Sequence, residues 1–239
     1  MLALREEMLK NCKICNGTGI VNIKDECECV RKYEYYVGLA YSGIDREYWD
    51  LSLDDWNGDE LAKDLVVAYI KNIDVAFKEG LGIVFFGSNG VGKTFAATQI
   101  LKEAQKKGHS IYKITLAELL ERIKSSFESN KEEFDEFYQE NILDISFLVL
   151  DNLSSEYSPK NNKTFPIARL DLLFRHRRGN CLPTIITTNF EKNEFIDNYG
   201  TSVNSLLSSR SKFIQVTGDD YRKNQQSDWD KFIIIKKEK

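Results

Sequence analysis

The eight residues at positions 87–94 read GSNGVGKT and constrain the fold of this chain more than any other segment. They match the pattern G-x-x-x-x-G-K-[ST], which a chain of this composition matches by chance in roughly 1 of 100 cases. An apolar run at 83–86 leads into the segment, and a helical pattern over 95–107 follows it. Glycines let successive backbone N–H groups turn toward an anion, and the start of a helix adds a positive field. The segment is therefore predicted to be a phosphate-binding loop between a strand and a helix, and this context disfavours a plain glycine turn.

Two residues of this loop have distinct predicted tasks. The ammonium of Lys93 is expected to reach the β- and γ-phosphates of a nucleotide, and the hydroxyl of Thr94 is expected to ligate magnesium. The predicted nucleotide-binding residues are Gly87, Ser88, Asn89, Gly90, Val91, Gly92, Lys93, Thr94 and Phe95.

Short apolar runs alternate with helical patterns through the rest of the chain. The predicted strands cover 83–86, 110–114, 147–150, 184–187 and 213–216. One amphipathic helix is expected before Gly80, with Leu61, Leu65, Val66, Tyr69, Ile70, Ile73 and Phe77 on its apolar face. A long helical region over 117–142 is expected to break near 129–130. Strands and helices in this alternation predict an α/β fold with a parallel sheet.

Composition bounds the remaining possibilities. The chain has 239 residues, of which 42% are hydrophobic, which suits one domain with its own core plus a small appendage. A formal net charge of −4 argues against a protein that coats nucleic acid by bulk charge. No apolar run approaches 18 residues, and positions 1–11 lack the apolar stretch of a secretory signal. We expect a cytoplasmic protein with no membrane association.

Polar side chains follow two of the predicted strands. Asp151 comes directly after the run at 147–150, where the end of a buried strand would place it beside the phosphate loop, to hold magnesium together with Thr94. The next residue, Asn152, has an amide that cannot take a proton, and Glu156 is the nearest carboxylate beyond it. Asn189 follows the strand at 184–187, where an amide could orient the attacking water or sense the γ-phosphate.

Four of the five cysteines lie in an 18-residue window, at Cys12, Cys15, Cys27 and Cys29. Four thiolates suffice for a closed tetrahedral zinc site. A module of this size has too little core to hold itself, so bound metal would supply its folding free energy. Reduced buried thiols and an iron–sulfur cluster are the alternatives. The predicted organisation is a zinc-binding module over 1–41, a linker over 42–58 and a nucleotide-binding domain over 59–239.

Further motifs follow these elements in a recognisable order. They are WDLSLDDW at 49–56, PTIITTN at 183–189, LLSSRS at 206–211 and TGDDYR at 217–222. From about residue 43 to 222, the chain resembles the DnaC/IstB-like branch of AAA+ ATPases, which includes bacterial and phage replicative-helicase loaders. The phosphate loop is common to all P-loop proteins, whereas the elements at 187–189 and 206–222 are more specific to this branch.

The resemblance implies a P-loop NTPase of AAA+ type and roles for four polar residues. Asn189 matches the residue known as sensor 1. Arg210 matches the arginine that reaches in trans into the nucleotide of a neighbouring subunit, which implies self-association. Arg222 matches an arginine near the C-terminus that senses nucleotide, and Arg177 resembles a further recurring arginine. No long helical pattern follows Arg222, so the usual AAA+ lid is expected to be absent or reduced.

One departure from the family pattern concerns hydrolysis. The family usually has a second acid after the magnesium-binding aspartate, and here that position is Asn152. Three alternatives follow: hydrolysis is slow, or Glu156 replaces the missing acid, or nucleotide binding without turnover switches the protein between its states. We expect weak intrinsic ATPase activity, with Lys93, Asp151, Asn189, Arg210 and Glu156 as the catalytic candidates.

The function that the resemblance implies is ATP-dependent loading of the hexameric replicative DNA helicase onto single-stranded DNA. The cysteine-bearing N-terminus looks like the helicase-contacting module of Gram-positive and phage loaders. Two alternatives remain open at this point: a transposition helper ATPase of the IstB kind, and a zinc-bearing adaptor that binds ATP without hydrolysing it.

Overall fold

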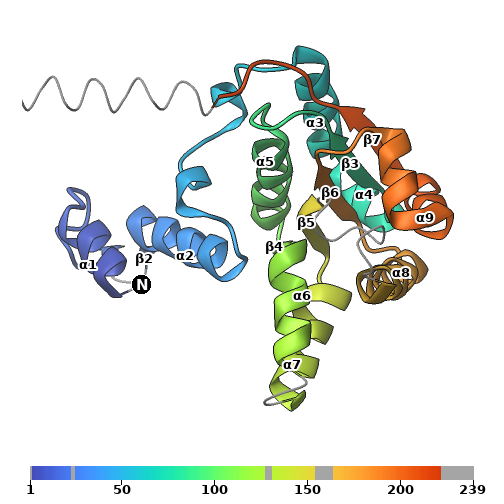
Figure 1. Cartoon of the computed structure of the whole chain (residues 1–239). Coiled ribbons are helices and arrows are strands. Elements are labelled where there is room, and N and C mark those ends of the chain that lie inside the picture. Colours follow the sequence, from blue (N-terminus) through green and yellow to red (C-terminus); the bar gives the residue numbers. More distant parts are fainter. Residues whose placement is uncertain (1, 23–24, 127–130, 154–163, 222–239) are drawn as a thin grey trace, which may run out of the picture. The chain divides into compact units, whose positions relative to one another are not determined.

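The computed structural model describes residues 2–22, 25–126, 131–153 and 164–221. The chain divides into two compact units, Met1–Leu51 and Ser52–Lys239, which are described separately below (Figure 1). The boundary falls inside the segment 42–58 that was predicted to be a linker. Residues 42–51 belong to the N-terminal unit, and residues 52–58 begin the larger one.

The N-terminal unit contains two helices and a short hairpin. Its elements are α1 (Leu2–Lys10), β1 (Ile20–Asn22), β2 (Asp25–Glu26), α2 (Glu28–Tyr41) and the 3-10 turn η1 (Arg46–Tyr48), with β1 and β2 antiparallel. Trp49 stacks on Tyr36 of α2 with ring centroids 5.4 Å apart, and the Trp49 indole N–H donates to the Ile44 carbonyl. These contacts explain why the first part of the predicted linker is folded.

The larger unit begins with η2 (Leu53–Asp55), α3 (Glu60–Lys71) and α4 (Ile73–Glu79). The single helix predicted before Gly80 is therefore two helices that meet at Asn72, and Gly80 ends α4 in the left-handed conformation. The apolar face was also misassigned in part. Leu61 and Leu65 are 77% and 42% exposed, because α3 packs on its neighbours through Ala62 and Val66.

Five parallel strands form the sheet, as the sequence predicts. They are β3 (Gly82–Phe86), β4 (Ile111–Thr115), β5 (Phe147–Leu153), β6 (Thr184–Thr188) and β7 (Ser211–Gln215), in the order β4-β5-β6-β3-β7. Strand β3, which leads into the phosphate loop, lies between β6 and β7. Strand β6 in turn separates β3 from β5, so the ends of these strands meet at one edge of the sheet.

Helices cover both faces of this sheet (Figure 1). On one face, α5 (Lys93–Lys106) packs across β3, β4, β5 and β6. On the other, α6 (Leu116–Ser125), α8 (Thr164–Gly179) and α9 (Lys192–Ser208) enclose an apolar cluster. The predicted helical region 117–142 comprises α6, α7 (Lys131–Tyr138) and the π-turn η3 (Gln139–Leu143), and its predicted break at 129–130 lies outside the described residues.

Over the described ranges, none of the helices is both long enough and apolar enough to span a membrane. The expectation of a reduced lid concerns the chain after Arg222, which lies beyond the last described residue, Tyr221.

Candidate functional site

The phosphate loop joins the end of β3 to the start of α5, as predicted. Gly87 and Gly90 both have positive φ values, 138° and 77°. A side chain at Gly87 would clash with the Val216 carbonyl, and one at Gly90 would clash with the Asp220 carboxyl group. The loop is therefore held closely by the segment that follows β7, and only glycine fits at these two positions.

Lys93 and Thr94 begin α5 side by side. The ammonium of Lys93 is buried and donates to the carbonyls of Gly87 and Ser88 at 2.8 and 2.6 Å, which places it inside the curve of the loop. The Thr94 hydroxyl donates to Oδ1 of Asp151 at 2.9 Å. A phosphate anion bound by this loop would lie beside the ammonium, and the hydroxyl and carboxylate are oxygen ligands of the kind that magnesium prefers.

Asp151 is 6% exposed near the end of β5, beside the loop as predicted. Its Oδ1 also accepts a hydrogen bond from the hydroxyl of Thr187 on β6, at 2.5 Å, and its Oδ2 lies 3.6 Å from Nζ of Lys113 on β4. The sequence reasoning missed Thr187 and Lys113. The sequence carried a signal for Lys113, a lone charge inside an apolar strand, whereas Thr187 needed the register that pairs it with Phe85, two residues before the loop.

Asn152 lies where the register of β5 against β6 shifts, before β5 ends at Leu153. Its φ of 55° is left-handed, and its N–H donates to Oγ1 of Thr187 at 2.8 Å. The exposed side chain is a neutral amide where the family pattern has an acid. Glu156, the predicted substitute, lies outside the described residues.

Asn189 stands at the same edge of the sheet as Asp151 and the loop. It follows Thr188, which pairs with Phe86 on one side and with Leu153 on the other. Phe86 is the residue before Gly87, so Asn189 lies between the phosphate loop and the end of β5, with an exposed side chain. Contact of Asn189 with the γ-phosphate or the attacking water stays a prediction.

Arg210 lies at the opposite edge of the sheet. It precedes β7, its carbonyl accepts from the Gly82 N–H at the start of β3, and its guanidinium donates to the Glu79 carbonyl. A five-residue strand rises about 3.3 Å per residue, so roughly 15 Å separates this edge from the phosphate loop. Arg210 is therefore not brought to the phosphate loop of its own chain. Arg222 lies outside the described residues.

Arg177, which the resemblance singled out without a clear role, is a structural residue. Its side chain is 1% exposed on α8. It donates to the carbonyls of Ile142, Leu143, Ile145 and Pro183 and to the hydroxyl of Thr184. Burial lowers its pKa to about 9. These bonds tie the turn before β5 to the start of β6.

The segment after β7 connects the phosphate loop to the start of α3. Asp59, the N-cap of α3, accepts from the N–H and the hydroxyl of Thr217 at 2.9 and 2.6 Å. The Tyr221 N–H donates to the Gly90 carbonyl at 3.1 Å. Partial burial opposes ionisation of Asp59, but the donors from Thr217 and Ala62 outweigh it and hold the pKa of Asp59 below its usual value. The sequence reasoning did not find this connection.

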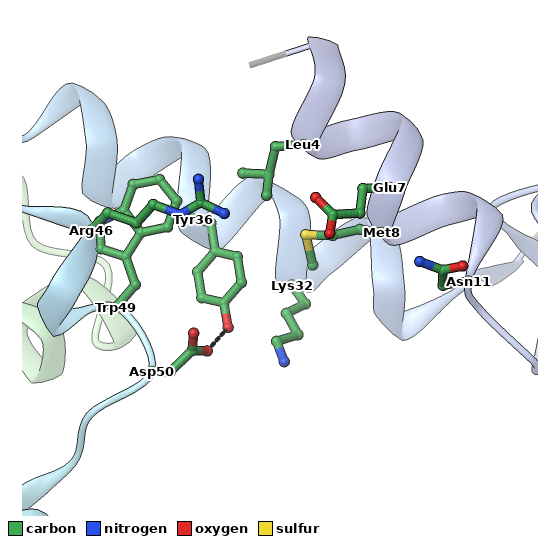
Figure 2. Close-up of a pocket in the computed structure, with 9 residues that line it drawn as sticks. All are labelled: Leu4, Glu7, Met8, Asn11, Lys32, Tyr36, Arg46, Trp49 and Asp50. Carbon is green, nitrogen blue, oxygen red and sulfur yellow. Dashed lines mark hydrogen bonds between the residues drawn. The ribbon is translucent and has the colours of Figure 1, made fainter. Parts of the chain in front are cut away.

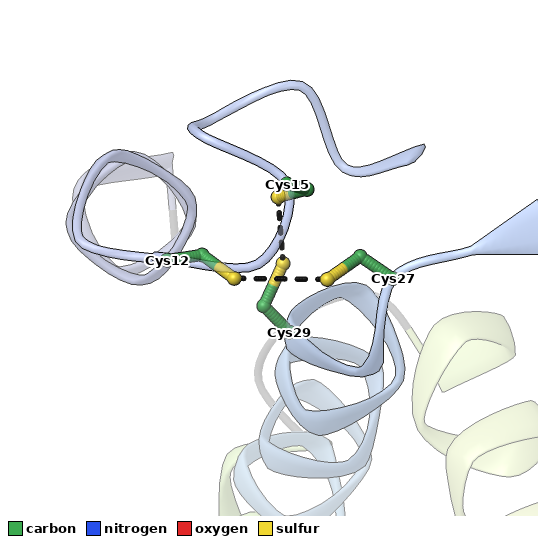
Figure 3. Close-up of side chains that lie close together, drawn as sticks. All are labelled: Cys12, Cys15, Cys27 and Cys29. Carbon is green, nitrogen blue, oxygen red and sulfur yellow. Dashed lines mark hydrogen bonds between the residues drawn. The ribbon is translucent and has the colours of Figure 1, made fainter. Parts of the chain in front are cut away.

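The four predicted zinc ligands are brought together in the N-terminal unit (Figure 3). The Sγ atoms of Cys12, Cys15, Cys27 and Cys29 all lie within 4.8 Å of one another, and the pairs Cys12–Cys27 and Cys15–Cys29 are 3.6 Å apart. These separations are too long for a disulfide. Four sulfurs at about 2.3 Å around a tetrahedral zinc are about 3.8 Å apart, so the donor set and its geometry fit zinc.

The protonation of these thiols differs across the cluster. Burial opposes ionisation of Cys15, but the Gly19 N–H, which donates to its sulfur at 3.2 Å, and the neighbouring thiols outweigh it and lower its pKa to about 6. Burial and the other three thiols raise the pKa of Cys29 to about 12. Four crowded sulfurs thus oppose full ionisation, and a divalent cation at their centre would remove that conflict.

The N-terminal unit also carries a pocket of about 300 Å³ between α1, α2 and the residues around η1 (Figure 2). Its apolar wall includes Met8, Tyr36 and Trp49, and the Tyr36 hydroxyl donates to Asp50. The ammonium of Lys32 lies 5.4 Å from the centre of the Tyr36 ring. A pocket with an aromatic wall and both signs of charge at its rim can take an amphipathic side chain or peptide.

Known proteins resemble both the sequence and the fold. The chain is 25% identical over 126 residues to a replicative helicase loader DnaC of Buchnera aphidicola, a match that spans 52% of this chain and only 51% of that protein. It is also 25% identical over 148 residues to an insertion sequence IS21-like putative ATP-binding protein of Bacteroides fragilis, spanning 62% of this chain and 67% of that one.

Solved structures agree with this result. The crystal structure of the DnaC helicase loader superposes with a TM-score of 0.62 at 25% identity, covering 72% of this chain and all of that chain. A crystal structure of DnaI, at 22% identity and a TM-score of 0.57 over 74% of this chain and 93% of that one, supports the fold. A family model described as IstB-like ATP binding protein matches residues 57–228, most of the chain. The chain therefore belongs to the IstB-like ATP-binding family and has the parallel, helix-flanked sheet of an AAA+ P-loop ATPase.

Proposed function

We propose that this protein is an ATPase that binds the hexameric replicative DNA helicase and helps to place it on single-stranded DNA. The observation that carries the proposal is the pairing of two sites in one chain. One is a phosphate loop with Thr94 and Asp151 in contact, and the other is a separate unit with four clustered cysteines. The likeness to a helicase loader supports the choice of partner. Such a role places the protein in the cytoplasm.

The proposed reaction is hydrolysis of ATP at the edge of the sheet. The backbone of the loop and the Lys93 ammonium hold the β- and γ-phosphates, and Thr94 and Asp151 hold magnesium, which when bound neutralises charge on the phosphates. Asn189 positions the attacking water. Asn152 cannot accept a proton from that water, so intrinsic turnover is slow, and Glu156, four residues further along the chain, is the proposed substitute base.

Self-association follows from the position of Arg210. Its guanidinium lies at the edge of the sheet away from its own phosphate loop and is exposed. We assign it to the nucleotide of a second copy, where it stabilises charge that develops on the γ-phosphate. ATP binding then favours the contact between copies, and hydrolysis or release weakens it.

The N-terminal unit is the proposed helicase-binding module. Zinc held by the four cysteines gives it a fixed structure without an open coordination position for chemistry. Three apolar side chains near the cluster are exposed: Ile14 (63%), Ile20 (55%) and Val21 (47%). Exposed apolar side chains on a small unit support a protein partner.

Contact with single-stranded DNA is proposed for the assembled protein. Several basic side chains of one copy are engaged already: Arg177 and Lys102 are buried, and Lys106, Arg122 and Arg175 pair with acids on their own helices. Several copies side by side would combine the remaining positive charge in one groove. Binding through phosphates should weaken steeply as salt is raised.

The second candidate is a transposition helper ATPase, favoured by the family match and by the insertion-sequence relative. The cysteine cluster argues for the loader, because transposition helpers typically lack such a module. A non-hydrolysing adaptor is the third candidate and is supported by Asn152. Hydrolysis measured with and without helicase and single-stranded DNA separates the adaptor from the two ATPases.

The deciding experiment is native mass measurement of the protein mixed with the cognate helicase or with a transposase, with and without ATP. The proposal predicts a complex with the helicase whose stoichiometry changes with ATP. Lys93→Ala should keep the helicase contact, because that contact is made by the other unit, and should lose the response to ATP. Binding to the transposase alone would replace the loader by the transposition helper.

A further inference from the structure

Strand β4 carries a buried positive charge beside the nucleotide site. Lys113 is 7% exposed between Tyr112 and Ile114, and its ammonium lies 3.6 Å from Oδ2 of Asp151. In the register of β4 and β5, Thr115 pairs with Asp151, so residues 113 and 151 project from the same face of the sheet one step apart. The pairing of these two charges is thus built into the strand register.

The two oxygens of Asp151 have different partners. Oδ1 accepts from the hydroxyls of Thr94 and Thr187, whereas Oδ2 faces the Lys113 ammonium. Removal of the Lys113 ammonium would leave the buried Asp151 carboxylate less compensated, at a cost in free energy. Lys113 therefore supplies at this edge the kind of charge compensation that a divalent cation supplies in other phosphate-binding sites.

We propose that Lys113 is a resident counter-cation of Asp151 and that it makes nucleotide binding by this chain less dependent on magnesium. The idea rests on the nucleotide-binding function proposed above and assigns Lys113 as a positioning residue. A magnesium ion held by Thr94 and Asp151 would have to share the carboxylate with the Lys113 ammonium. When magnesium is removed, the ammonium still keeps Asp151 compensated and adds positive potential near the phosphates.

The test is the affinity for a fluorescent ADP analogue, measured once with excess magnesium and once with EDTA. The quantity to compare is the dissociation constant in EDTA divided by the dissociation constant in magnesium. Lys113→Met removes the charge and keeps most of the side-chain volume, and it should raise this ratio by roughly 10-fold or more. Two effects raise the ratio. The analogue binds more weakly in EDTA because the ammonium is gone, and it binds more tightly with magnesium because Asp151 is free to hold the ion.

The matched control is Lys102→Met, which removes another buried ammonium from α5 on the same side of the sheet. Because the Lys102 charge acts on Asp55, this variant should leave the ratio unchanged. An equal ratio in the wild type and in Lys113→Met overturns the role of Lys113. A wild type that binds the analogue in neither condition overturns the nucleotide-binding function itself, so the two failures are distinguishable.

A second measurement covers the case in which Lys113→Met folds poorly. Thermal unfolding without nucleotide should show a fall of roughly 5 °C or more for Lys113→Met. Adding Asp151→Asn to that variant removes the uncompensated charge and should recover part of the loss. Purely additive effects of the two substitutions would contradict the proposal. Magnesium alone should raise the melting temperature of Lys113→Met more than that of the wild type.

Discussion

The nucleotide end of the larger unit and the cysteine cluster of the N-terminal unit differ in how the charge of their ionisable groups is compensated. Both gather charged or ionisable groups that would repel or remain uncompensated if left alone. At the nucleotide end, the fold already supplies compensation, with Asp151 paired to Lys113 and bound by two hydroxyls. In the cysteine cluster, four thiols face one another within 4.8 Å.

The difference predicts opposite responses to a missing ligand. The larger unit has a five-stranded sheet with apolar clusters on its faces, so it should keep its fold without nucleotide. The N-terminal unit has a small core, so its fold should depend on metal.

Removing one zinc ligand should unfold one unit and spare the other. In Cys15→Ser, we expect zinc content to fall below half an equivalent, and amide protection over residues 2–51 to be lost, because structural zinc supplies the folding free energy of small modules. Hydrogen exchange read by mass spectrometry measures both units in one experiment. Cys181→Ser, outside the cluster, is the matched control. If amides 2–51 stayed protected from exchange in metal-free protein, the N-terminal unit would not depend on metal for its fold, which would contradict the prediction.

Arg177→Met should destabilise only the larger unit. The substitution leaves several buried carbonyls without a donor, and a loss of about 3–5 kcal/mol in the free energy of unfolding is expected. Urea unfolding followed by tryptophan fluorescence provides the measurement, with Arg178→Met as an exposed neighbour that should cost little. A loss below 1 kcal/mol would show that Arg177 does not hold the two turns together.

Asn152→Glu should accelerate hydrolysis without changing nucleotide affinity. It places a proton acceptor where the family pattern has an acid, and general-base groups contribute about 10²–10⁴-fold, so a rise of roughly 10-fold is a modest expectation. Asn152→Gln has the same length and strains the left-handed backbone equally, which isolates the effect of charge. Equal turnover in both variants would mean that another group already serves as the base.

Asp59→Ala should cost about 1 kcal/mol, because α3 loses its N-cap. The pKa of Asp59 is lowered in the fold, so its contribution is present above the unfolded value near 4 and is lost as pH falls below it. Stability of the variant should therefore depend less on pH in that acidic range. Asp64→Ala on the exposed side of α3 is the control, and an identical pH profile in both variants would contradict the role of Asp59.

The elements that the sequence predicted well are those determined by local pattern. The phosphate loop, the five strands and the four cysteines each have a signature within a few residues, and each lies where it was expected. The same holds for Asp151, because a buried strand fixes the position of the residue at its end.

The misses came from packing between segments distant in sequence. Leu61 and Leu65 fit an apolar helical face, yet the smaller Ala62 and Val66 are the residues that meet the rest of the fold. The boundary between the two units at Leu51 depends on the stacking of Trp49 on Tyr36, and no local sequence pattern predicts that contact. The pairing of Lys113 with Asp151 could be predicted only from the register of β4 against β5.

We propose that a triphosphate bound at Lys93, Thr94 and Asp151 decides how neighbouring copies touch. Native mass measurement of the protein alone, with and without ATP, tests it directly when the wild type is compared with Lys93→Ala. The account predicts that ATP shifts the wild type toward larger assemblies and leaves the variant unchanged, with equal zinc content in both. An ATP-driven shift that persists in Lys93→Ala would contradict the claim.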